Sequence, residues 1–131
     1  MTRATKRVLI VGDNKLYRAS LASVLERGGH DVSLGENGAE ALMYLPGADV
    51  VLFDLEMHSL DVMRLLEALS RGGRDRSNPW QTVLAVADAC DPGVAARLYA
   101  LGVERVLIRG QVTPNDLCAL VDALPARPIA A

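Results

Sequence analysis

Short apolar segments alternate with amphipathic ones five times along this chain, and this alternation limits the folds that are open to it. Three of the apolar segments are almost solid, and two are weaker and flanked by polar residues. Solid apolar strands rich in β-branched residues are typical of a parallel sheet that helices cover on both faces. The solid segments are Val8–Val11, Val50–Phe53 and Val83–Ala87, and the weaker ones are Asp31–Glu36 and Arg105–Gly110.

The segments between the predicted strands carry the signals of helix ends. A side chain that can cap a helix precedes each of them, and two of the caps are followed by proline, which is favoured at the first helical position. Asn37 also has Glu40 three residues on, as in a capping box. The predicted caps are Asn14, Asn37, either Ser59 or Asp61, Asp91 and Thr113, and the predicted stops are Gly28 and Gly102.

A strand followed by a helix, repeated five times, indicates an α/β fold with a doubly wound parallel sheet. Right-handed crossovers and two weak strands favour the order 2-1-3-4-5, which places the weak strands at the edges. This is the flavodoxin-like (βα)5 sandwich. The 131 residues suit one domain, residues 1–131, with a core at about 6–124 and frayed ends. The polar segment Arg71–Pro79 is predicted to be a loop.

Composition narrows the range of partners. The formal net charge is −2, which gives no reason to expect nucleic acid or an anionic membrane surface as a partner. No apolar run approaches the length needed to cross a bilayer, and we expect a cytoplasmic protein. Cys90 and Cys118 lack a metal-ligand spacing and are interpreted as small buried apolar residues, with a disulfide left open.

Two carboxylates are predicted to meet at one edge of the sheet. Asp13 follows the first strand, and the apolar run of the third strand ends on Asp54. In the order 2-1-3-4-5 the carboxyl ends of these two strands form the crevice in which such folds bind ligands. A strand-ending aspartate is by itself more often structural, and Asp13 also suits the start of a helix. Together they favour a site that reacts or that holds a metal ion.

The residues at the strand ends carry a family resemblance. They are VLIVGDN (Val8–Asn14) followed by Arg18, DVVLFDLEMHSLD (Asp49–Asp61) and GVERVLIRGQVTPNDL (Gly102–Leu117). The chain resembles the receiver domains of bacterial two-component response regulators over almost its whole length. The resemblance implies phosphoryl transfer from a histidine kinase to an aspartate, assisted by Mg²⁺. It assigns Asp54 as the phosphoacceptor, and Asp13, Asp54 and the backbone carbonyl of Glu56 as metal ligands.

The departures from the family pattern concern the same site. Gly12 replaces an acidic residue, so the resemblance implies a weak Mg²⁺ site, which the side chain of Glu56 is a candidate to compensate. Ala87 replaces the Ser or Thr that binds the phosphoryl group, and Val106 replaces the aromatic residue that responds to it. Arg109 replaces the family lysine; it either pairs at the surface or reaches over Asp54. Asp88 and Asp91 are interpreted as turn and cap residues, His58 as a loop residue and Trp80 as a packing anchor.

These features predict a stand-alone, atypical receiver domain whose output is a protein contact. The expected partners are a histidine kinase or phosphotransfer protein, or another protein. A homodimer through the last two helices and the fifth strand is also expected.

One alternative is a pseudo-receiver adaptor that works without phosphorylation. Another is a Mg²⁺-dependent phosphatase with an aspartate nucleophile, although its motif has an aspartate where this chain has Glu56. A flavin carrier is disfavoured because Asp13 would repel a phosphate. No enzymatic activity is expected beyond self-phosphorylation of Asp54.

Overall fold

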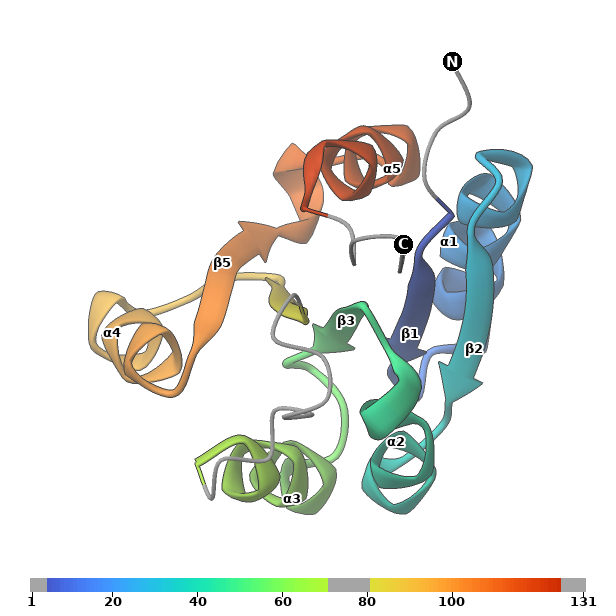
Figure 1. Cartoon of the computed structure of the whole chain (residues 1–131). Coiled ribbons are helices and arrows are strands. Elements are labelled where there is room, and N and C mark those ends of the chain that lie inside the picture. Colours follow the sequence, from blue (N-terminus) through green and yellow to red (C-terminus); the bar gives the residue numbers. More distant parts are fainter. Residues whose placement is uncertain (1–4, 71–80, 126–131) are drawn as a thin grey trace.

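The computed structural model describes residues 5–70 and 81–125, which form a parallel sheet between two layers of helices (Figure 1). The sheet has five strands in the order β2-β1-β3-β4-β5, so the predicted topology is confirmed. The strands are β1 (Arg7–Val11), β2 (Asp31–Gly35), β3 (Val50–Asp54), β4 (Thr82–Ala87) and β5 (Val103–Ile108). The helices are α1 (Lys15–Arg27), α2 (Gly38–Tyr44), α3 (Ser59–Ser70), α4 (Pro92–Ala100) and α5 (Pro114–Ala123).

The central strands are apolar on both faces because each face is covered by helices. Val50 and Leu52 pack with α1 and α5, and the alternate residues Val51 and Phe53 pack with α2, α3 and α4. Every residue of β3 is buried, including its terminal carboxylate. Side chains of a strand alternate between its two faces, so a solid apolar run buries both.

The predicted caps are confirmed at four helices, with one difference in detail. Asn14 accepts a hydrogen bond from the Tyr17 amide, and Thr113 and Asp116 form a full capping box. Asn37 accepts from the Glu40 amide, but the Glu40 carboxylate accepts from the Glu36 amide instead of closing a capping box. The Glu40 carboxylate thus binds the amide one residue before the cap instead of the amide of the cap itself.

The first four strands differ from their predicted bounds by one residue each, and the larger differences lie at β5 and at the start of α3. β5 begins at Val103, two residues before the predicted start, because Gly102 takes a left-handed φ of 100° and turns the chain directly from α4 into the strand. The strand ends at Ile108, and Arg109–Gln111 form a short 3-10 helix. Helix α3 begins at Ser59, and Asp61 binds the Gly38 amide across to α2 instead of capping.

Cys118 is buried as predicted, whereas Cys90 is only half-buried; neither forms a disulfide within the described ranges. Across residues 5–70 and 81–125, no helix combines the length and the apolar character that a bilayer crossing requires. The predicted loop at Arg71–Pro79 and Trp80 lie outside the described residues.

Candidate functional site at the carboxyl edge of the sheet

Asp13 and Asp54 lie at the same edge of the sheet, as predicted from the strand order. β1 pairs with β3 so that Val11 faces Phe53, and the next residues along the two strands are Gly12 and Asp54. A Cβ atom placed on Gly12 would lie 3.2 Å from the Asp54 Cβ. The Asp13 carboxylate accepts a hydrogen bond of 3.2 Å from the amide of His58, in the loop that follows β3.

Asp54 is a buried carboxylate with strong hydrogen-bond donors. It is 5% exposed, and its Oδ1 accepts from the Glu56 amide at 2.8 Å and from Arg109 Nη2 at 2.6 Å. A buried carboxylate requires such partners, because an ionised group without them is strongly destabilised away from water. The guanidinium therefore lies against Asp54 and offsets its charge, in agreement with the interpretation that Arg109 reaches over this carboxylate.

Arg109 has two further partners that the sequence did not indicate. Its Nε lies 3.0 Å from Asp88 Oδ1, as an ion pair without hydrogen-bond alignment, and its Cζ lies 4.5 Å from the centre of the Tyr17 ring. Burial alone would lower the pKa of the guanidinium, but the hydrogen bond to Asp54 and the neighbouring acidic groups raise it. Arg109 is thus a permanent cation, and Asp88 is an ion-pair partner in addition to a turn residue.

Tyr17 forms the wall of a narrow cavity beside Asp54. The cavity has a volume of about 10 Å³ and is lined by Gly12, Tyr17 and Asp54, among others. The Tyr17 hydroxyl is buried and has no hydrogen-bond partner within the described residues. Burial raises the pKa of the Tyr17 phenol, and the charge of Arg109 opposes this shift. The space is at the lower limit for one water molecule.

Ala87 and Val106, the two apolar residues that depart from the pattern of the resemblance, are placed by the strand register. Ala87 is fully buried at the end of β4, and its methyl group offers no hydroxyl to a group on Asp54. Val106 pairs with Ala85 on the neighbouring strand and packs, half-buried, against the core. Neither position therefore offers a side chain that can form a hydrogen bond with a group on Asp54.

The oxygen donors at this edge suit Mg²⁺ only in part. Gly12 supplies no carboxylate, Asp54 Oδ1 already binds a cation, and Glu56 Oε1 accepts from the Asp88 amide at 3.1 Å. In the part of the chain that is described, the acidic side chains here do not place three ligand atoms within 4.8 Å of one another. Mg²⁺ favours near-octahedral oxygen coordination and retains waters, so two carboxylates and a carbonyl are a sparse donor set for it.

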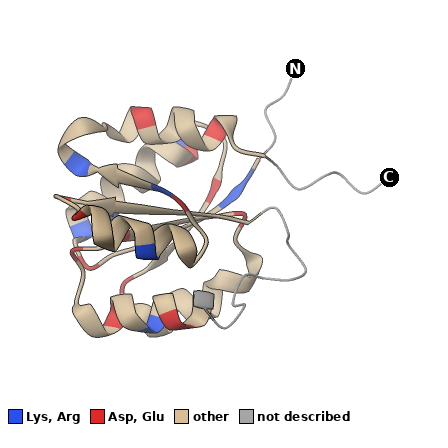
Figure 2. Cartoon of the chain, turned by 90° about the vertical axis from the view of Figure 1, so that its left-hand side faces the viewer, with Lys and Arg blue, Asp and Glu red and all other residues tan. Residues whose placement is uncertain are grey.

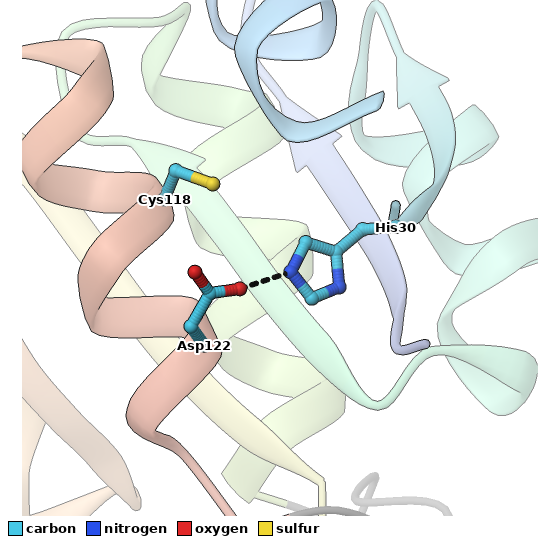
Figure 3. Close-up of side chains that lie close together, drawn as sticks. All are labelled: His30, Cys118 and Asp122. Carbon is cyan, nitrogen blue, oxygen red and sulfur yellow. Dashed lines mark hydrogen bonds and ion pairs between the residues drawn. The ribbon is translucent and has the colours of Figure 1, made fainter. Parts of the chain in front are cut away.

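A second polar cluster, which the sequence did not indicate, lies at the opposite edge of the sheet (Figure 3). His30 precedes β2, and its Nε2 lies 2.7 Å from Asp122 Oδ1 on α5. Ligand atoms of His30, Cys118 and Asp122 all lie within 4.8 Å of one another. However, His30 Nδ1 accepts a hydrogen bond of 3.2 Å from the Lys6 amide, which places the ring proton on Nε2. A metal at Nε2 would displace the ring proton, and Nδ1 cannot take it up because it already accepts a hydrogen bond. We therefore interpret the cluster as a structural contact between the residue before β2 and helix α5.

The hydrogen bond between His30 and Asp122 predicts that two substitutions of Asp122 differ in their effect on stability. Asp122→Ala leaves the Nε2–H of a side chain that is 1% exposed without this acceptor. We expect the free energy of unfolding to fall by about 1–3 kcal/mol, the range for a buried donor that loses its partner. Asp122→Asn keeps an oxygen that can accept the bond and should lose less than half as much in urea unfolding. Equal losses for both variants would show that the carboxylate does not act through His30.

The comparisons with known proteins agree with this geometry. A family model described as the response regulator receiver domain matches residues 8–122. The chain is 31% identical over 120 residues to the Regulator of RpoS of Escherichia coli (strain K12), covering 90% of this chain and 34% of that protein. It is 34% identical over 85 residues to Hybrid signal transduction histidine kinase A of Dictyostelium discoideum, covering 63% of this chain and 4% of that protein.

Solved structures show the same fold. A response regulator receiver protein from Pseudomonas putida superposes with a TM-score of 0.76 at 25% identity, covering 92% of this chain and 98% of that one. Chemotaxis protein CheY4 of Vibrio cholerae superposes with a TM-score of 0.77 at 21% identity, covering 93% of this chain and 100% of that one.

The chain belongs to the response regulator receiver domain family of two-component signalling. Domains of this family generally bind Mg²⁺ at the phosphorylation site and interact with histidine kinases or phosphotransfer proteins.

Proposed function

We propose that this receiver domain accepts a phosphoryl group on Asp54 from a histidine kinase or phosphotransfer protein. The observation that carries the proposal is the ion pair of 2.6 Å between Asp54 and Arg109 at the edge that also holds Asp13. A carboxylate and a phosphoryl donor repel each other, so a fixed cation at the point of attack is the feature that such a reaction requires.

In the proposed step, an Asp54 carboxylate oxygen attacks the phosphorus of the donor. The bond from phosphorus to the donor atom breaks, and the leaving group departs with its electron pair. Arg109 balances the charge that gathers on the phosphoryl oxygens. Asp13, Asp54 and the carbonyl of Glu56 would hold Mg²⁺, which supplies further charge stabilisation when bound. We expect its affinity to be low because Gly12 offers no carboxylate.

We infer that the output is a protein contact made without the usual hydroxyl–aromatic switch. The buried Ala87 and the half-buried Val106 support this, because neither side chain can form a hydrogen bond with a modified Asp54. The partner is a kinase, a phosphotransfer protein or another protein, and we propose a homodimer through α4, β5 and α5 as an additional assembly. The domain covers residues 1–131, with its core at about 6–124.

A second candidate is an adaptor that works without phosphorylation. One observation favours it: Arg109 already neutralises Asp54, so the unmodified site resembles one whose charge is balanced. In this case the domain would hold one conformation and bind its partner constitutively.

The test is phosphorylation of the purified protein with acetyl phosphate and Mg²⁺, followed by borohydride reduction and peptide mass spectrometry. We expect one acyl phosphate per chain, located at Asp54. No uptake would overturn phosphoacceptance and favour the adaptor, and uptake at another residue would refute the assignment of Asp54. Sustained turnover of a generic phosphomonoester would instead support the aspartate-nucleophile phosphatase.

A further inference from the structure

One cation is shared between the site and the first residue after β4. Arg109 Nη2 binds Asp54, and its Nε lies 3.0 Å from Asp88, whose side chain is 68% exposed. The guanidinium also lies over the ring of Tyr17, and its Nε and Nη2 atoms present one cation to two carboxylates. A change in charge at one partner therefore alters the hold of Arg109 on the other.

A second route connects the same two residues through Glu56. The Glu56 amide donates to Asp54 Oδ1 at 2.8 Å, and the Glu56 side chain accepts from the Asp88 amide at 3.1 Å. Asp54 and Asp88 are thus linked through Arg109 on one side and through Glu56 on the other. Asp88, which begins the connection to α4, therefore has two contacts with residues that bind Asp54.

The segment after Asp88 leads to helix α4, which buries few of its side chains. Among the residues of α4 only Leu98 is fully buried, and the helix packs on β5 at one end of the sheet (Figure 1). Figure 2 faces this side of the molecule and shows α4 in front of the sheet; Arg97 is its one charged residue. A displacement at residue 88 can therefore move α4 at the expense of little buried apolar surface.

We propose that Asp88 competes with the phosphoryl group for Arg109, and that this competition connects Asp54 to α4 in place of the lost hydroxyl–aromatic pair. The inference rests on the proposed phosphorylation of Asp54. A phosphoryl group adds about −1.5 to −2 charges and three strong acceptors, and it draws the guanidinium fully toward Asp54. Asp88 then loses its cation, faces a larger like charge, and moves away with the start of α4.

The test uses Asp88→Asn, which removes the charge and keeps the shape, with Asp31→Asn at the exposed opposite edge as the matched control. Beryllofluoride with Mg²⁺ serves as the phosphoryl mimic, and amide NMR follows Leu98, Tyr99 and Ala100 at the far end of α4. We expect these amides to respond in the wild type and in the control. In Asp88→Asn they should already be displaced before the mimic is added, and beryllofluoride should bind about fivefold more tightly, as expected for one exposed charge.

The outcomes separate this inference from the proposed function. An α4 response in Asp88→Asn equal to that of the wild type would refute the role of Asp88, even though the mimic binds. If the wild type binds no beryllofluoride, the proposed function fails. The spectra of the wild type and of Asp88→Asn without the mimic then still test whether Asp88 is coupled to α4. Identical amide chemical shifts of Leu98–Ala100 in Asp88→Asn and in the wild type would refute this coupling, and different chemical shifts would support it.

Discussion

Replacing Arg109 with alanine is expected to slow phosphorylation of Asp54 by acetyl phosphate by about 10²-fold, the usual loss when one fixed charge-stabilising donor is removed. The reason is the position of the guanidinium, 2.6 Å from a carboxylate that is 5% exposed. Without it, Asp54 and Asp88 together repel the incoming donor. The same change should raise the affinity of the site for Mg²⁺, because a competing cation is lost. Rate and metal affinity therefore move in opposite directions, which a loss of folding would not produce.

Two further variants make the Arg109 result specific. Arg109→Lys keeps the charge but has one compact ammonium group, so it should recover most of the rate while losing the simultaneous contact with Asp88. Arg105→Ala removes an exposed arginine from β5 and should leave both readouts unchanged. Initial rates of acyl phosphate formation and calorimetric Mg²⁺ titration measure the two effects. An Arg109→Ala rate equal to that of the wild type would show that this cation does not assist the reaction.

The features that sequence predicted well depend on local patterns. Apolar runs determine the strands, and the weakness of two runs placed them at the edges, which gave the sheet order. That order alone brought Asp13 and Asp54 to one edge. The N-caps were predictable for the same reason, because Asn14 and Thr113 bind amides only three residues away.

The contacts that the sequence did not predict are those between side chains far apart in the chain. No local sequence pattern indicates which residue is the partner of which. His30 and Asp122 are 92 positions apart, and nothing in either segment marks the other. Asp88 and Arg109 follow neighbouring strands, so the topology placed them near each other. Their pairing, however, depends on where β5 ends: the predicted strand included Arg109, whereas the observed strand stops at Ile108. Beyond the strand end the arginine side chain is able to turn over Asp54.

Gly12→Asp is expected to raise the Mg²⁺ affinity of the site by about 10- to 100-fold, the effect usually seen when an outer-sphere group at a metal site is lost or restored. Gly12 does not have a positive φ, so the backbone accepts a side chain. The added Cβ would lie 3.2 Å from that of Asp54, which requires a shift of a few tenths of an ångström. A carboxylate at this position, beside Asp13 and Asp54, can hold a water bound to the metal, which glycine cannot do.

The matched control for this change is Gly12→Asn, which has the same shape and no charge. We expect the asparagine variant to bind Mg²⁺ no better than the wild type, which separates the carboxylate from the added bulk. Three neighbouring carboxylates repel one another without metal, so Gly12→Asp should be less stable than Gly12→Asn in a chelating buffer. It should gain about 2.7 kcal/mol in free energy of unfolding at Mg²⁺ one hundred times its Kd. Equal affinities for the two variants would mean that the missing carboxylate at Gly12 is not what makes the site weak.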